Sequence, residues 1–256
     1  MAIHTIARII IVATAIGWSE AAQAELPSGF VYLADIDSGI VQDLRYAGLH
    51  NFVGRRIAGY EAAECVLTEK AASALARAQA RLSAQNLSLM VWDCYRPERA
   101  VADFVSWSKI AGDTRMKAEF YPHTEKSRFF ALGYIAQRSG HSRGSTVDIG
   151  IVPKDVTAPL VFDPAQPLRS CIAAKAARFD DGTIDFGTGY DCFDERAATR
   201  HPGVGRQARA NRELLRSTME GAGFEPYAKE WWHFGLAEEP FHNRSFDFPV
   251  VSRGSR

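Results

Sequence analysis

The chain has 256 residues, of which 46% are hydrophobic and 23% are charged. This composition is typical of a globular protein with a sizeable core, and it excludes a disordered or fibrous chain. Thirty basic and thirty acidic residues cancel, so the charge balance does not favour nucleic acid or an acidic membrane face as a partner. A small or neutral substrate fits better.

Residues 1–24 differ in character from the rest. A weakly basic start precedes an apolar stretch from Ile9 to Trp18 and the tripeptide Ala22-Gln23-Ala24. These are the features of a secretory signal peptide with an A-x-A cleavage site. The alternative is a membrane anchor, but about ten apolar residues fall short of the roughly 20 that span a bilayer. We therefore expect export to the periplasm without a membrane anchor, and one mature domain over residues 25–256.

The first half of the mature chain predicts a helix, a strand and a second helix. Residues 68–82 lack Gly and Pro and are rich in Ala, Arg, Gln and Leu, which favours a helix of about four turns. Residues 87–92 form a short apolar run typical of a buried strand. Pro97 suits the first turn of the following helix, whose apolar side chains recur at helical spacing at Val101, Phe104, Val105 and Ile110.

The second half adds two strands and a helix. Apolar branched residues alternate through 146–152, which predicts a strand whose Asp148 faces away from them. Residues 211–220 favour a helix that stops at a glycine, and residues 231–234 are apolar enough for a third strand. Helices and separated strands together indicate an α+β fold, a single domain with a small, mostly antiparallel sheet, flanking helices and a metal site on the sheet.

Four cysteines, an even number, lie in the mature chain, at Cys65, Cys94, Cys171 and Cys192. In an oxidising compartment they form disulfides. No C-x-x-C pair occurs, so a zinc-cysteine site is disfavoured. Three pairings are possible, and we favour Cys65 with Cys94 and Cys171 with Cys192. The second disulfide would cross-link residues 152–205, which we expect to form a long, partly irregular loop; loops of this length are often functional.

The segment from Ser139 to Asp148 carries the first pair of candidate metal ligands. His141 lies in a glycine-flanked loop, and Asp148 follows seven residues later on the predicted strand. Imidazole and carboxylate are common zinc ligands. Taken alone, a histidine and an aspartate at this spacing are more often an exposed ion pair, or a histidine whose hydrogen bonds are made within the protein. The strand register strengthens the metal interpretation, because a carboxylate on an otherwise apolar strand needs a partner.

Glu230-Trp231-Trp232-His233 supplies a second half-site. A carboxylate and an imidazole three residues apart share a face on a helical turn but oppose each other on a straight strand. We therefore expect a bend near Glu230 and His233 on the strand. By itself the tetrapeptide is more often an aromatic core cluster with a peripheral salt bridge.

Together the two segments predict one catalytic zinc ion per chain, held by His141, Asp148 and His233 with a fourth position open. Glu230 would accept a proton from the attacking water. No H-E-x-x-H motif occurs, which excludes a thermolysin-type site. Arg96 is the candidate for stabilising the negative charge of the tetrahedral intermediate, a contribution of about 2.7 to 4 kcal/mol, although most arginines are solvated or paired at the surface.

In order along the chain, these motifs resemble the D-alanyl-D-alanine dipeptidases of the vancomycin-resistance type, within a zinc D,D-peptidase superfamily that also contains carboxypeptidases. The resemblance runs through Asp43 to Ala47, Asn51-Phe52, Trp92 to Pro97, Ser139 to Asp148, Glu230 to His233 and Phe246 to Pro249.

The resemblance implies the same zinc ligands, base and arginine, and hydrolysis of D-alanyl-D-alanine to two D-alanine molecules. It also implies Ser139 near the substrate carboxylate, Tyr60 lining the pocket and Asp191 at the free amine of the substrate. An exported enzyme would serve wall turnover or D-alanine recovery. The alternatives are a zinc D,D- or L,D-carboxypeptidase acting on longer wall peptides, and a non-catalytic zinc-stabilised module that binds them.

Overall fold

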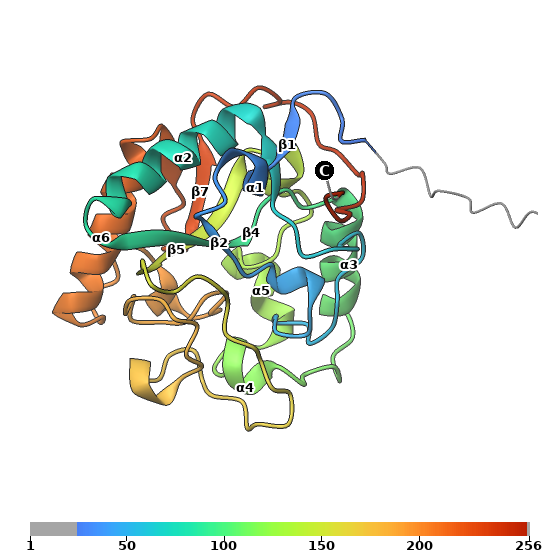
Figure 1. Cartoon of the computed structure of the whole chain (residues 1–256). Coiled ribbons are helices and arrows are strands. Elements are labelled where there is room, and N and C mark those ends of the chain that lie inside the picture. Colours follow the sequence, from blue (N-terminus) through green and yellow to red (C-terminus); the bar gives the residue numbers. More distant parts are fainter. Residues whose placement is uncertain (1–24, 255–256) are drawn as a thin grey trace, which may run out of the picture.

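The computed structural model describes residues 25–254 (Figure 1). The predicted signal peptide, residues 1–24, lies outside the described residues and stays a prediction. The helices are α1 Leu33–Ile36, α2 Glu69–Ser83, α3 Glu98–Ser108, α4 Lys117–Phe120, α5 Phe129–Leu132 and α6 Arg206–Glu220. The strands are β1 Phe30–Tyr32, β2 Val41–Gln42, β3 Val66–Thr68, β4 Leu87–Asp93, β5 Thr146–Pro153, β6 Phe224–Pro226 and β7 His233–Leu236. Within residues 25–254, no helix has the length and apolar character needed to cross a membrane.

The central sheet has five strands in the order β2-β4-β5-β7-β6. Only β2 and β4 run parallel, and the other neighbours are antiparallel. Strands β1 and β3 form a separate antiparallel pair. The fold is therefore α+β with a mostly antiparallel sheet, as the sequence predicts.

Helices α2 and α6 pack side by side and contact β4 and β6 respectively (Figure 1). Helix α2 begins after Thr68, whose hydroxyl accepts the N–H of Ala71 at 3.3 Å and caps the helix. Its buried residues, Ala71, Leu75, Ala78 and Leu82 among them, join the core formed by the sheet. Helix α6 starts at Arg206, earlier than predicted, and ends before Gly221 as expected.

Strand β5 has one apolar face and one face that carries Asp148. Val147, Ile149 and Ile151 are fully buried in the core that α2 shares. Residues 154–205 contain no strand and only short 3-10 helices, as predicted. They contact β5 through the amide of Ile184, which donates to Ile151 O at 3.0 Å.

Both predicted disulfides, Cys65–Cys94 and Cys171–Cys192, are present. The second closes part of the irregular segment on itself, and the amide of Cys171 also donates to Glu119 O at 2.9 Å. The long loop is thereby tied to the body of the molecule.

Two predicted boundaries are wrong by a few residues. Pro97 precedes α3 as its N-cap residue, and the helix ends at Ser108, which leaves Ile110 outside it and 56% exposed. The last predicted strand begins at His233, because the preceding residues form a turn in which the amide of His233 donates to Glu230 O at 3.3 Å.

Candidate active site

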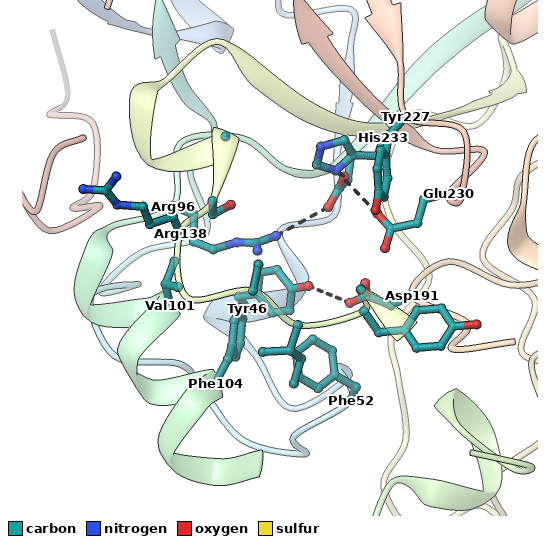
Figure 2. A pocket seen from close by; sticks show the side chains of 17 residues that line it. Tyr46, Phe52, Arg96, Val101, Phe104, Arg138, Asp191, Tyr227, Glu230 and His233 are labelled. Carbon is teal, nitrogen blue, oxygen red and sulfur yellow. Dashed lines mark hydrogen bonds and ion pairs between the residues drawn. The ribbon is translucent and has the colours of Figure 1, made fainter. Parts of the chain in front are cut away.

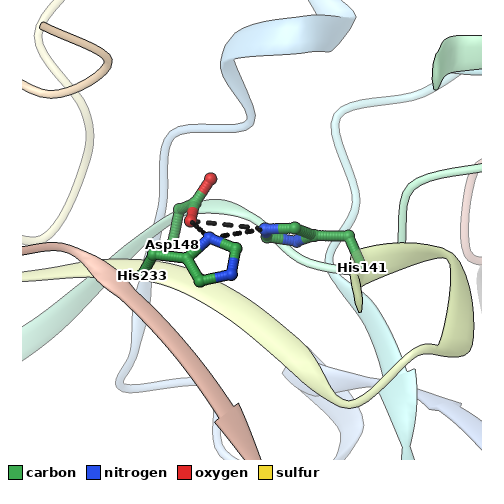
Figure 3. A group of neighbouring side chains, drawn as sticks. All are labelled: His141, Asp148 and His233. Carbon is green, nitrogen blue, oxygen red and sulfur yellow. Dashed lines mark hydrogen bonds and ion pairs between the residues drawn. The ribbon is translucent and has the colours of Figure 1, made fainter. Parts of the chain in front are cut away.

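The three predicted metal ligands come from three elements and meet at one point (Figure 3). His141 lies in a 3-10 helix, Gly140–Arg143, and Asp148 on β5 faces His233 across the β5–β7 pairing. Asp148 Oδ1 lies 3.3 Å from His141 Nε2 and 3.0 Å from His233 Nδ1. One ligand atom of each residue lies within 4.8 Å of the others. Two imidazoles and a carboxylate suit a catalytic zinc ion.

His141 is held in the tautomer that a metal ligand requires. Its Nδ1 lies 2.7 Å from the carbonyl oxygen of Cys94. Because a carbonyl only accepts hydrogen bonds, Nδ1 carries a proton, and Nε2 is the ring nitrogen that faces Asp148. The hydroxyl of Ser139 accepts the backbone N–H of His141 at 3.3 Å and orients the loop.

The two imidazoles also determine the charge of Asp148. Burial alone would raise the pKa of its carboxyl, but the neighbouring His141 and His233 lower the pKa below its usual value. The carboxylate form, which is the form that binds a cation, is therefore favoured.

Arg96 is fixed beside this group by Asp93, the last residue of β4. Its Nε donates to Asp93 Oδ2 at 2.8 Å, and its Nη2 lies 3.6 Å from Asp148 Oδ2. The hydroxyl of Tyr60 donates to Asp93 Oδ1 at 2.6 Å. Burial raises the pKa of Asp93, while Arg96 and His141 oppose that rise.

Tyr60 does not lie where we expected it. Its side chain is buried and is not among the residues that line the cavity beside the ligands. The physical reason is the hydrogen bond to Asp93, which holds the phenol at the carboxylate that also binds Arg96.

A cavity of about 210 Å³ opens beside the three ligands (Figure 2). Its polar lining includes Arg96, Ser139, Asp148, Asp191, Glu230 and His233, and its apolar lining includes Phe52, Val101 and Phe104. Except for Tyr60 and the fully buried His141, every predicted site residue therefore lines this one cavity.

Glu230 lies in the turn that precedes β7, with Oε2 3.6 Å from His233 Nδ1. Burial, reinforced by the charge of Asp148 and opposed by His233, raises the pKa of its carboxyl to about 7. A carboxyl group that titrates near neutral pH can accept a proton and pass it on.

Asp191 lies on the other side of the cavity (Figure 2). Its backbone has a left-handed φ of 55°, uncommon outside glycine, and its Oδ2 accepts a hydrogen bond from the hydroxyl of Tyr46 at 2.6 Å. Burial raises the pKa of Asp191 well above its usual value, and the charge of Asp148 adds to the rise.

Sequence reasoning missed four aromatic or acidic residues around the site. Tyr46 lies in the motif Asp43 to Ala47, and Asp93 lies in the motif Trp92 to Pro97. Only their contacts in the structure show that they hold Asp191 and Arg96. Tyr190 directly precedes Asp191, and its hydroxyl donates to Asp148 Oδ2 at 3.0 Å. Tyr227 lines the cavity with its ring 5.5 Å from that of His233. No spacing pattern could have found these two.

Comparison with known proteins gives a consistent result. The sequence model of the D-ala-D-ala dipeptidase family matches residues 27–161 and 170–251. A D-alanyl-D-alanine dipeptidase of Enterococcus faecium is 34% identical over 223 residues, which cover 87% of this chain and 98% of the relative. One from Streptomyces coelicolor is 38% identical over 87% of this chain and 98% of its own length. One from Escherichia coli is 30% identical over 81% of this chain and 84% of its own.

Proposed function

Because the chain belongs to the D-ala-D-ala dipeptidase family, we propose that it is a zinc-dependent enzyme that hydrolyses D-alanyl-D-alanine to two molecules of D-alanine. One observation carries the proposal. Glu230 and Asp191 line the same small cavity as two of the three clustered candidate ligands. A base, a metal site and a site for an amine are thus within reach of one short peptide.

The donor set of His141, Asp148 and His233 would hold the zinc ion. Zinc in such a site supplies a Lewis acid that activates water and polarises a carbonyl group. Glu230 takes the proton from the attacking water and delivers it to the departing amine. Its raised pKa, about 7, suits both transfers.

Arg96 has its guanidinium fixed before substrate arrives, since Asp93 and Asp148 both hold it. It would stabilise the negative charge that develops on the carbonyl oxygen. Ser139 lines the same cavity, and its hydroxyl is available to the carboxylate of the substrate.

Asp191 favours a free dipeptide over a longer peptide. In the unliganded enzyme burial keeps its pKa high. The ammonium group of a free dipeptide would offset that burial and favour the carboxylate form. An acylated peptide has no ammonium group, so it gains no ion pair with Asp191 and should bind less well.

The test is an assay of purified protein with D-alanyl-D-alanine and with an acylated peptide that ends in D-alanyl-D-alanine. We expect release of D-alanine from the free dipeptide alone. Cleavage of the acylated peptide would instead favour the carboxypeptidase alternative. Tight binding of wall peptides without hydrolysis would favour the binding module, although such a module has no need for Glu230 or Arg96.

We also propose that the enzyme is exported to the periplasm and serves wall turnover or D-alanine recovery. The support is the Ala22-Gln23-Ala24 pattern together with two disulfides, which persist in oxidising compartments. Cell fractionation followed by N-terminal sequencing tests this: the mature protein should begin at Glu25 and be found outside the cytoplasm.

A further inference from the structure

The two oxygens of the Asp148 carboxylate have different surroundings. Oδ1 faces the imidazoles of His141 and His233, at 3.3 and 3.0 Å. Oδ2 accepts a hydrogen bond from the Tyr190 hydroxyl at 3.0 Å, and Arg96 Nη2 lies 3.6 Å from it. One oxygen is therefore directed at the ligand cluster, and the other is already engaged by protein donors.

The Tyr190 ring is fixed independently of any metal. It is 3% exposed and stacks on Trp92 with ring centres 4.7 Å apart. Trp232 meets it edge to face at 5.5 Å. Trp92 lies on β4 and Trp232 directly before β7, so the two neighbours of β5 hold the phenol. Its position is thus determined by the sheet that carries Asp148.

The direction of the hydrogen bonds follows from counting protons. Tyr46 donates its hydroxyl proton to Asp191 at 2.6 Å, so its oxygen can only accept from Tyr190, which lies 3.4 Å away. The single hydroxyl proton of Tyr190 is closer to Asp148, at 3.0 Å, and a carboxylate is the stronger acceptor. Tyr190 therefore donates to Asp148.

We infer that Tyr190 is a positioning residue of the metal site. By holding Oδ2, it stops the carboxylate of Asp148 from rotating and leaves Oδ1 as the only oxygen that binds the ion. The inference rests on the proposed zinc site and adds a residue to it. Loss of such an outer hydrogen bond typically weakens metal binding by about 10- to 100-fold.

The test replaces Tyr190 by Phe, which removes the hydroxyl and keeps the ring between its two tryptophans. Competition of purified protein with a chromogenic zinc chelator should show zinc affinity lowered by roughly 10- to 100-fold. Tyr95→Phe is the matched control, because the Tyr95 hydroxyl donates to Phe248 O at 3.0 Å and Tyr95 does not line the cavity. This control should keep the wild-type affinity.

A spectrum separates positioning from a general loss of stability. With Co²⁺ in place of zinc, visible absorption weakens as the coordination number rises. If Oδ2 becomes a second ligand atom in Tyr190→Phe, the cobalt spectrum loses intensity relative to that of the wild type. A purely structural role of the hydroxyl would lower the melting temperature and leave the spectrum unchanged.

Three outcomes would overturn the inference. Equal zinc affinity and equal cobalt spectra of Tyr190→Phe and wild type would remove the role of Tyr190 and leave the proposed function intact. A wild-type protein that binds no zinc would remove both. A structure of the zinc-loaded wild type, which needs no variant, would contradict us if both oxygens of Asp148 bound the ion.

Discussion

Glu230 and His233 are three residues apart and face the same cavity, yet their replacement should have different effects. Glu230→Gln keeps the shape of the side chain and removes the base, so kcat for D-alanyl-D-alanine should fall by about 10²- to 10⁴-fold with bound metal retained. His233→Ala removes a ligand and should lose the metal. Elemental analysis beside the D-alanine assay distinguishes the two results. A Glu230→Gln protein with normal turnover would show that the base is elsewhere.

Asp93 is the residue on which the position of Arg96 depends. Asp93→Ala leaves a guanidinium that is only 14% exposed without its closest partner, which typically costs about 3–5 kcal/mol of unfolding free energy. Urea denaturation measures that loss, and kcat should fall as well. Asp103→Ala is the control, because its partner Arg55 is 41% exposed and such pairs contribute about 1 kcal/mol or less. Equal losses in the two variants would contradict the assignment.

At the scale of elements, long periodic segments could be predicted and short ones could not. Helix α2, strand β5 and the bend before His233 follow from patterns within a few residues. Strands β1 and β2 have three and two residues, too few to show a period, and they exist because distant segments pair with them. The candidate metal ligands could be proposed from the sequence because each of the two segments, 139–148 and 230–233, carries a recognisable pair of polar residues, and the structure brings His141, Asp148 and His233 together. The place of Tyr60 could not, since it depends on a contact with Asp93, 33 residues away.

The disulfide Cys171–Cys192 connects an irregular segment to the residue next to Asp191. The double variant Cys171→Ala/Cys192→Ala should lose about 3 kcal/mol of unfolding free energy through loop-closure entropy. The KM for D-alanyl-D-alanine should also rise, because Asp191 is no longer held in its left-handed conformation. Denaturation and steady-state kinetics measure the two effects. Stability lost with KM unchanged would show that Asp191 is positioned without the disulfide.

For the molecule as a whole, the proposed metal site lies in the middle of the sheet, where β5 has neighbours on both sides. An ion that binds only the folded state should therefore stabilise the entire domain. With free zinc at 100 times its Kd, the gain is about 2.7 kcal/mol, or roughly 5–10 °C in melting temperature for a domain of this size. Calorimetry with zinc and with a chelator tests this. An unchanged melting temperature would argue against zinc at this site.

Cys94 takes part in two bonds of different kinds: its sulfur is joined to Cys65, and its carbonyl fixes the proton of His141. A single residue thereby connects the oxidation of a thiol with the orientation of a candidate metal ligand. A newly made chain whose thiols are still reduced would hold His141 less firmly and take up the ion less readily. We therefore expect oxidation of Cys65 and Cys94 to precede metal loading. If the chain is exported as we propose, the enzyme would become fully active only in the oxidising compartment in which its disulfides persist.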